Sequence, residues 1–557
     1  MQLVECVPNF SEGRDKQKIK AITDEIVKVK GIMLLDVDPG EATNRTVVTF
    51  IGPPDAVVEA AFQAIKKAAE VIDMRTQTGE HPRQGATDVC PFVPVSELTM
   101  EDCAELARRL GKRVGEELEI PVYLYEYAAT RPEWKSLANI RTGEYEALEE
   151  KLKKPEWKPD FGPARFNARA GVTVIGAREF LIAYNVNLNT RSKRLANRIA
   201  KTIREKGTPR RDENRKLMRD GAGNLVYAPG LLKECRAVGW YIDEYDMAQI
   251  SINLTNYNIT PIHLAFDTAC EEAAKLGLRV TGSEVVGLVP KEAMLMAGRH
   301  YLEKQSQNPG VPEKELIRVA VQSMGLAEVA EFDPQDKIIE YAYKKDVSGL
   351  VDMRVHAFMD LLSTDAPAPG GGSVAALNGA LSASLSAMVA ALTESKRKFK
   401  SVRQEMRGLA QQAQALKYFF LQAIDDDTDA FNEIMDAFGL PKKTEQEQQQ
   451  RADAIEAATK KATLVPFSVL EKCGDIAAFA LQVADKGNPN SLSDAGVAGL
   501  TARAAAMGAY YNVLINVTGL TDAAFVADIT ARAKNKKQEV LEIVEKVEAL
   551  LEERLQS

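Results

Sequence analysis

The sequence APAPGGGSVAALNGALSASLSAMVAALT, residues 366–393, marks the part of the chain whose fold is easiest to predict. It contains no charged residue and is long enough to cross a bilayer. It opens with prolines and glycines, however, and then carries Ser373, Asn378 and Ser382 among alanines. Small residues of this kind let helices approach one another closely. We therefore expect a buried helix of a helical domain and no membrane span.

Long helical stripes with abundant alanine continue from this helix to the C-terminus, with almost no strand signal. The pattern predicts an all-α helical bundle over residues 346–557, preceded by a linker at 329–345. The expected helices cover residues 355–363, 373–393, 401–440, 444–484, 492–517 and 522–555.

Upstream, strand-like and helical patterns alternate in the order β-α-β-β-α-β, and a similar order begins again near Gly171. We expect an α+β half of two subdomains, at 1–178 and 179–328. Residues 207–230 are charged and rich in glycine, which predicts a long surface loop. The expected strands cover 3–8, 32–37, 46–51, 89–95, 122–125, 172–177, 180–187, 237–242, 248–254 and 285–290, and the expected helices 15–29, 54–71, 100–118, 193–206 and 260–277.

Composition excludes several classes of protein. The net charge of −8 argues against non-specific binding to nucleic acid. Six cysteines in 557 residues form no C-x-x-C pair, which indicates buried thiols in a reducing cytoplasm. Four histidines without an H-E-x-x-H motif argue against a zinc site, and we expect no metal.

The loop GEHPRQG, residues 79–85, is the densest cluster of polar and turn-forming residues in the first half. It lies between a predicted helix and a predicted strand, where functional sites concentrate. An imidazole at His81 can act as a general acid or base near neutral pH. The alternative is a solvated loop histidine.

Two further loops could contribute to the same site. Asp36 and Asp38 end a predicted strand, where a carboxylate could orient a histidine, or could simply be solvated beside a Pro-Gly turn. The segment PNFSEG, residues 8–13, precedes a helix that Ser11 could merely cap.

The helical half offers three candidate segments. Gly370, Gly371, Gly372 and Ser373 open a helix, whose free N–H groups suit an anion, or they form a hinge. Residues 425–429 place four acids in little more than one helical turn, so that either one enters a site or all are solvated. Residues 487–494, GNPNSLSD, cap the next helix and could line a site with amide and hydroxyl groups.

Together these segments resemble the formiminotransferase-cyclodeaminase family of folate enzymes, along nearly the whole chain. The first half matches through VECVPNFSEG at 4–13, LLDVD at 34–38, TNRTV at 43–47, GEHPRQGATDVCPFVP at 79–94, PVYLY at 121–125, GEYEAL at 143–148 and PDFGP at 159–163. The helical half matches through APGGGSVAA at 368–376, D-x-D-x-x-A-F at 425–431 and YYNVLIN at 510–516.

The resemblance implies two ferredoxin-like subdomains that form a transferase, followed by a helical cyclodeaminase. The first activity would move the formimino group of N-formimino-L-glutamate to nitrogen-5 of tetrahydrofolate and release glutamate. The second would close the ring onto nitrogen-10 and expel ammonia, giving 5,10-methenyltetrahydrofolate in histidine degradation and one-carbon metabolism.

The family's site residues are carried over by motif. The transferase histidine falls on His81, its acidic partner on Asp38, and the cyclodeaminase acid on Asp427, with Asp425 and Asp426 as neighbouring alternatives. The family's folate-contacting loop falls on 162–171, where Phe166 could stack on the pterin. The expected folate-binding residues are Gly162, Pro163, Phe166, Asn167, Arg169 and Gly171, together with Gly370, Gly371, Gly372 and Ser373.

The resemblance also implies a cytoplasmic homo-oligomer, dimer-based and up to an octamer, that takes formiminoglutamate and polyglutamylated tetrahydrofolate as small-molecule substrates. Clusters of basic residues at 193–198, 210–216 and 396–400 could hold the polyglutamate tail or could be solvated surface. The competing functions are a transferase with a degenerate or cyclohydrolase-type helical domain, and a non-catalytic folate-binding scaffold.

Overall fold

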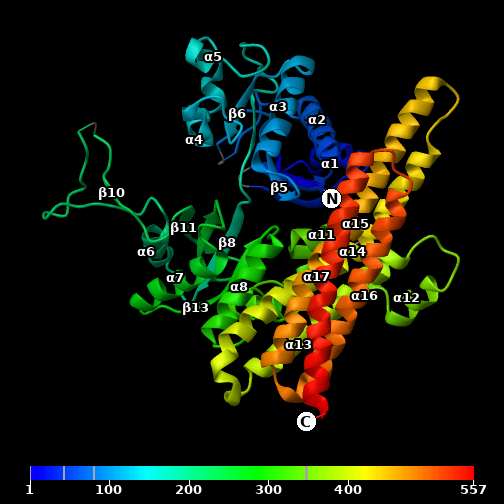
Figure 1. Ribbon diagram of the computed structural model, residues 1–557. Coiled ribbons are helices and arrows are strands. Elements are labelled where there is room, and N and C mark those ends of the chain that lie inside the picture. Colours follow the sequence, from blue (N-terminus) through cyan, green and yellow to red (C-terminus); the bar gives the residue numbers. More distant parts are fainter. Residues whose placement is uncertain (1, 42–43, 80–81, 222, 345–348, 557) are drawn as a thin grey trace. The chain divides into compact units, whose positions relative to one another are not determined.

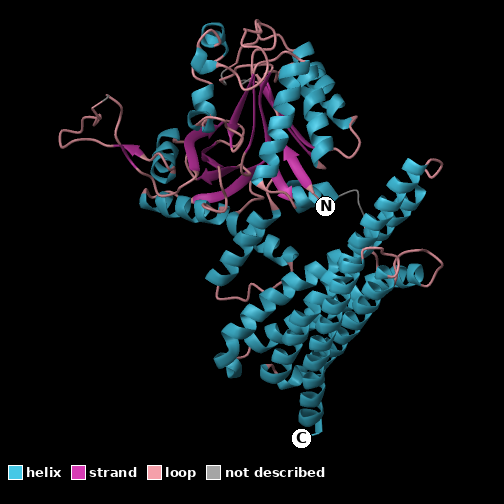
Figure 2. Cartoon of the chain, turned by 45° about the horizontal axis from the view of Figure 1, so that its top comes forward, coloured by secondary structure: helices cyan, strands magenta, loops and turns pink. Residues whose placement is uncertain are grey.

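The computed structural model describes the chain except residues 1, 42–43, 80–81, 222, 345–348 and 557. The chain forms two compact units. Unit 1 comprises Met1–Ala297 and Ala320–Lys345, and unit 2 comprises Gly298–Val319 and Asp346–Ser557. The strands all belong to unit 1, whereas the described part of unit 2 contains helices alone (Figure 2). Residues 298–319 group with the helical unit, and the domain boundaries expected from sequence stay a prediction.

The first sheet of unit 1 has seven strands. Their order is β3 (Met33–Gly40), β4 (Arg45–Gly52), then β1 (Leu3–Cys6) and β2 (Asn9–Phe10) together, β5 (Thr87–Ser96), β7 (Thr173–Ala177) and β6 (Val122–Glu126). Its first part, from β3 to β5, is antiparallel and has the ferredoxin-like order, while β7 and β6 extend the sheet in parallel. The sequence pattern begins again at residues 172–177, although the expected subdomain at 1–178 includes them. These residues join the first sheet as β7, and all five residues of β7 are buried between β5 and β6.

Three amphipathic helices, α1, α2 and α3, contribute apolar residues to one core with this sheet. The strands are β1 (Leu3–Cys6), β2 (Asn9–Phe10), β3 (Met33–Gly40), β4 (Arg45–Gly52), β5 (Thr87–Ser96), β6 (Val122–Glu126) and β7 (Thr173–Ala177), and the helices are α1 (Lys16–Val27), α2 (Pro54–Val71), α3 (Met100–Glu117), α4 (Leu137–Ile140) and α5 (Leu148–Lys151), with 3₁₀ turns at Pro132–Lys135, Tyr145–Ala147 and Pro155–Trp157.

The second sheet repeats the ferredoxin-like order as β11-β12-β8-β13, so both expected subdomain folds are present. The last strand lies earlier than the predicted 285–290 because Gly287, at φ +74°, turns the chain directly after Val286. The elements are β8 (Ile182–Leu188), α6 (Lys193–Ile203), β11 (Cys235–Ile242), β12 (Met247–Leu254), α7 (Ile262–Lys275) and β13 (Val280–Val286), followed by α8 (Lys291–Lys304), α9 (Glu313–Met324), α10 (Pro334–Lys337) and α11 (Ile339–Lys344).

The predicted loop at 207–230 is an exposed arm, which starts from β9 (Thr208–Pro209) and returns through β10 (Tyr227–Ala228) (Figure 1). It contains a repeat that we did not expect, RDENRKL at 211–217 and RDGAGNL at 219–225. In each copy the Asp side chain accepts from the N–H four residues on, at 2.8 Å. In each copy the Arg donates to the carbonyl four residues on, at 2.6 Å. Each turn is therefore closed by its own side chains.

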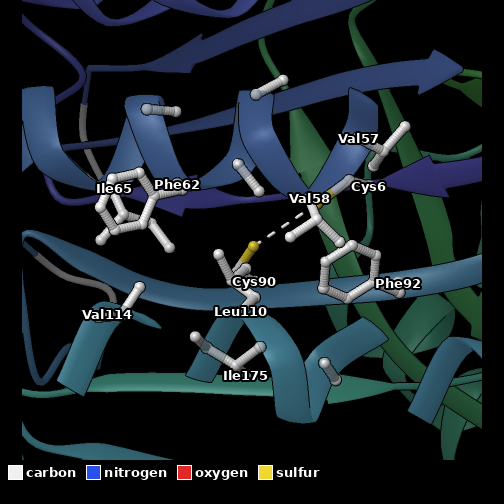
Figure 3. Packing of buried hydrophobic residues seen from close by; sticks show 14 of the residues in the cluster. Cys6, Val57, Val58, Phe62, Ile65, Cys90, Phe92, Leu110, Val114 and Ile175 are labelled. Atoms are coloured by element: carbon white, nitrogen blue, oxygen red, sulfur yellow. Dashed lines mark hydrogen bonds between the residues drawn. The ribbon is translucent and has the colours of Figure 1, made fainter. Parts of the chain in front are cut away.

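Two thiols lie next to each other in the core of the first sheet (Figure 3). Cys6 Sγ and Cys90 Sγ lie 3.5 Å apart, and both residues are fully buried among Val58, Phe92 and Leu110. Burial and the neighbouring thiol raise the pKa of Cys6 well above its usual range. Because the thiolate is the reactive form, the Cys6 thiol is unreactive and contributes to packing.

The buried Glu5 on β1 should make the stability of unit 1 depend on pH. Its side chain is 3% exposed, and burial raises its pKa to about 7 against the opposing attraction of Arg178. The folded state therefore retains a proton that the unfolded chain releases near pH 4.5. The resulting stability is fully present below pH 4.5 and is lost as the pH rises to about 7.

Glu5→Gln, which mimics the protonated form, is expected to match the wild type at pH 4.5. At pH 8 it should be more stable by about 2–3 kcal/mol. Thermal unfolding at both pH values checks this, with the exposed Glu116→Gln as control. A difference that does not change with pH would contradict the raised pKa.

Unit 2 is built around α13, which packs against α14 and α16 through small residues. A Cβ at Gly379 would stand 2.4 Å from the ring of Phe420, so glycine is required for this close approach. Within the described residues, α13 alone has the length and hydropathy of a membrane span, and 56% of its apolar window is buried in the structure. The helices are α12 (Val355–Leu362), α13 (Gly371–Glu394), α14 (Arg403–Gly439), α15 (Glu445–Lys486), α16 (Leu492–Val517) and α17 (Ala523–Gln556), with 3₁₀ turns at Leu350–Asp352, Arg397–Val402 and Pro489–Ser491.

Candidate functional site

His81 lies outside the described residues, but hydrogen bonds hold the chain on the N-terminal side of its loop. Asn44 donates to the carbonyl of Thr78 at 2.7 Å, and its own carbonyl accepts from Gln77 at 2.9 Å. Its side-chain oxygen also accepts from the N–H of Gly13 at 3.0 Å. Asn44 thus ties together three segments that the sequence proposed as one site.

The C-terminal side of the same loop is held by Ser11 and by the end of the predicted folate loop. Ser11 Oγ donates to the carbonyl of Gly85 at 2.7 Å, so this hydroxyl braces the loop. Gly85 and Gly171 form an antiparallel bridge, and the N–H of Ala86 donates to Ala170 at 2.8 Å. The structure therefore brings residues 170–171 directly against residues 84–86.

Gly171 is required for this junction. Its φ is +69°, and a Cβ there would stand 2.1 Å from the carbonyl oxygen of Gln84. Gly171→Ala is expected to destabilise unit 1 by about 2–5 kcal/mol, combining left-handed strain with overpacking. Gly223 provides the control, because its φ is +83° but a Cβ there would stand in open space. A substitution at this position therefore adds backbone strain without overpacking. Gly223→Ala should cost only about 1 kcal/mol. If thermal unfolding showed equal losses of stability in the two variants, the packing argument would be contradicted.

The remaining residues of the predicted folate loop have varied environments. Gly162, at φ +80°, lies against the carbonyl of Ile120, and Pro163 is half-buried. The Phe166 ring lies 5.5 Å from that of Tyr145. The carbonyl of Asn167 accepts from the N–H of Gly171 at 2.7 Å and closes the loop. Arg169 donates to the carbonyls of Ala69 and Glu70, so its described contacts cap the end of α2.

Asp38 is exposed on β3, paired in register with Val47 of β4. Its neighbour Asp36 is more buried, and burial together with the charge of Asp38 raises the pKa of Asp36. Because the histidine that Asp38 would assist is not among the described residues, this pairing stays a prediction.

The sequence did not predict a buried polar cluster beside the His81 loop. Asp88 is 1% exposed and accepts from the N–H of Gln84 at 2.9 Å and from Arg141. Arg45, from the TNRTV motif, donates to Asn9. The two arginines belong to distant segments, and spacing along the chain carried no signal that they meet.

In unit 2, Asp427 on α14 meets the Gly-rich start of α13. Ser373 Oγ donates to Asp427 Oδ2 at 2.9 Å. A Cβ at Gly372 would stand 2.0 Å from Asp427 Oδ1, so only glycine lets the carboxylate approach the helix start. Gly370 caps this helix, and a Cβ on Gly371 would lie 3.3 Å from Asn512 Nδ2.

The neighbouring acids have other partners. Asp425 accepts from the N–H of Leu350 at 2.7 Å and so caps a 3₁₀ turn. Asp426 accepts from Gln422 on its own helix at 3.0 Å. Asp427 is thus the member of the acidic run that contacts the Gly-rich segment. In the third segment, Asn488 caps the turn before α16, and its N–H donates to Thr393.

The pKa of Asp427 reflects two opposing effects. Burial raises it, while hydrogen bonds from the side chain and backbone of Ser373 lower it. Ser373→Ala removes a donor to the charged form, so the pKa of Asp427 should rise further. If Asp427 is the cyclodeaminase acid that the family resemblance implies, the acid limb of ring closure should move to higher pH. Ser384→Ala, whose hydroxyl donates to its own helix, is the matched control. Unchanged pH profiles in both variants would contradict this role.

Within the described ranges, no three His, Cys, Asp or Glu side chains cluster as a metal site would require.

Comparison with known proteins identifies the families that this chain matches. The formiminotransferase N-terminal subdomain family matches residues 3–178, the formiminotransferase domain family 183–344, and the formiminotransferase-cyclodeaminase family 354–535. A formimidoyltransferase-cyclodeaminase of Dictyostelium discoideum is 43% identical over 556 residues, covering 99% of each chain. The chain belongs to the formimidoyltransferase-cyclodeaminase family.

Other relatives match the parts of this family separately. A glutamate formimidoyltransferase of Thermoplasma acidophilum is 45% identical over 58% of this chain and 99% of its own length. A methenyltetrahydrofolate cyclohydrolase of Methylorubrum extorquens is 41% identical over 174 residues, which is 31% of this chain and 84% of its own. In the family, then, transferase and helical parts occur both joined and apart.

Proposed function

We propose that this chain transfers the formimino group of N-formimino-L-glutamate to nitrogen-5 of tetrahydrofolate and then cyclises the product to 5,10-methenyltetrahydrofolate. Glutamate leaves in the first step and ammonia in the second. The observation that carries the proposal is full-length similarity to a formimidoyltransferase-cyclodeaminase, with a separate buried polar centre in each unit.

In the transfer step, nitrogen-5 attacks the formimino carbon and must lose its proton, while the departing glutamate nitrogen must gain one. We assign both transfers to His81, since a near-neutral imidazole can accept and return a proton. Asp38 is assigned to orient it. The predicted folate loop at 162–171 would hold the pterin, with Phe166 offering an aromatic face.

In the second step, nitrogen-10 attacks the formimino carbon, and the former imino nitrogen leaves as ammonia. We assign Asp427 as the base that takes the nitrogen-10 proton and returns it to the leaving nitrogen of the protonated formimino group. Ser373 holds this carboxylate in place at 2.9 Å. The Gly-rich segment 370–373 is assigned to folate binding at the free N–H groups of the helix.

A coupled assay tests the whole proposal. Formiminoglutamate and tetrahydrofolate are supplied, and glutamate, ammonia and methenyl absorbance are followed together. Equal amounts of all three products are expected. Glutamate release without ammonia would indicate a transferase with a degenerate helical unit.

The similarity of 31% of the chain to a methenyltetrahydrofolate cyclohydrolase favours a second candidate activity. A cyclohydrolase opens the methenyl bridge with water and releases no ammonia. Supplying 5-formimino-tetrahydrofolate directly separates the two activities, because ammonia appears only if the helical unit is a cyclodeaminase.

We also propose a cytoplasmic homo-oligomer, dimer-based and up to an octamer, that uses polyglutamylated folate without a metal. The basic groups at 193–198, 210–216 and 396–400 are the candidates to bind the anionic tail. Such a tether raises the effective concentration of the intermediate at the second site.

A further inference from the structure

The buried polar cluster beside the His81 loop contains polar atoms that the described residues leave unsatisfied. Gln84 is fully buried; its Nε2 donates to the carbonyl of Ile140 at 2.8 Å, but its Oε1 has no hydrogen-bond partner among the described residues. The Nε–H of Arg141 is also buried and has no acceptor within the same part of the chain. Unsatisfied buried groups are costly, and a ligand that satisfies them would recover that cost.

Two guanidinium groups share this cluster. Arg141 donates to Asp88, whose other oxygen accepts from Gln84. Burial lowers the pKa of Arg45 to about 10, while Asp88 raises it and Arg141 lowers it, so the two arginines lie within electrostatic reach of one another. Paired guanidinium groups in a partly desolvated place are suited to a carboxylate.

Hydrogen bonds from Lys151 hold the backbone on both sides of Arg141. Lys151 donates to the carbonyls of Ile140 and Thr142, both at 2.8 Å, and its ammonium lies 3.9 Å from the centre of the Trp157 ring. The residues on each side of Arg141 are thereby fixed. The Arg141 side chain remains 15% exposed, so one side of the cluster reaches solvent.

We propose that Arg45 and Arg141 form the subsite for the amino-acid donor, with the guanidinium groups binding a donor carboxylate beside the buried Gln84. This inference rests on the proposed function. Gln84 stands three residues after His81 in the sequence, so the cluster neighbours the residue assigned to proton transfer. A donor whose carboxylates lie a few bonds from its reacting nitrogen requires such neighbouring groups.

A folate tail also carries carboxylates, so the test separates the two sources. Steady-state transfer by the full chain is measured with formiminoglutamate and with its α-amide and γ-amide. The wild type should prefer formiminoglutamate over one amide by about 10- to 100-fold in kcat/KM, and that amide identifies the bound carboxylate.

Arg45→Gln should reduce this preference to less than about threefold while leaving the KM for tetrahydrofolate unchanged. Arg141→Lys, which retains a charge beside Asp88, should reduce it in part. Arg75→Gln, which breaks an exposed ion pair with Asp73, should leave it intact.

Equal losses with acid and amide in Arg45→Gln would indicate a purely structural role and overturn the subsite. A raised KM for tetrahydrofolate with the donor preference intact would assign the arginines to the folate tail and also overturn it. The affinity for L-glutamate, measured by calorimetry, is a second readout that does not depend on turnover. Weaker binding in Arg45→Gln would support the subsite even if the wild type catalysed no transfer, a result that would contradict only the proposed function.

Discussion

His81→Ala is expected to slow glutamate release by about two to four orders of magnitude, the range contributed by positioned proton transfer. The reason is chemical, since the transfer moves one proton off nitrogen-5 and another onto the leaving nitrogen. The described residues on both sides of position 81 are tied to Asn44 and Ser11, so the substitution should not loosen the loop's attachment. Stopped-time assays of glutamate with saturating tetrahydrofolate give the measurement.

The same variant should still deaminate 5-formimino-tetrahydrofolate supplied from outside, because that chemistry is assigned to unit 2. His356→Ala, an exposed histidine on α12, is the matched control and should transfer at the wild-type rate. Transfer by His81→Ala within a few-fold of the wild type would remove His81 from the mechanism.

The second large effect is expected for Asp427→Asn, on the rate of ring closure. The amide keeps the shape beside Gly372 and Ser373 but cannot accept the nitrogen-10 proton, so ring closure should fall by about two to four orders of magnitude. Transfer should continue, and 5-formimino-tetrahydrofolate should accumulate as glutamate is released. Following glutamate and ammonia in one reaction measures both steps.

Asp429→Asn provides a stringent control, since Asp429 is exposed two residues further along the same helix. It should release ammonia at the wild-type rate. If Asp425→Asn abolished ammonia release while Asp427→Asn did not, the catalytic acid would have been assigned to the wrong member of the run.

The overall fold was predictable because local patterns determine it. Alternating strands and amphipathic helices in the order β-α-β-β-α-β leave few ways to build a sheet, and both sheets have the ferredoxin-like order. The strand at 173–177 was harder to place. Its residues are buried on both faces, so its pattern does not show which sheet it joins.

The sites were predictable only in part. Four acids within five residues look alike in sequence, and the partner of Asp427 on another helix distinguishes it in the structure. The Arg141–Asp88 pair joins residues 53 positions apart, and local spacing carries no information about such a contact. His81 and Asp38 as transferase residues stay predictions from motif and chemistry.

The arm at 207–230 has a consequence for how this protein can change in length. Each seven-residue copy closes its own turn with side-chain hydrogen bonds, and the copies repeat every eight residues. The base of the arm is closed separately where Thr208 pairs with Ala228. A copy could therefore be added or deleted without disturbing the rest of unit 1. The arm is modular, and its length can evolve, or be engineered to display a peptide, in steps of eight residues.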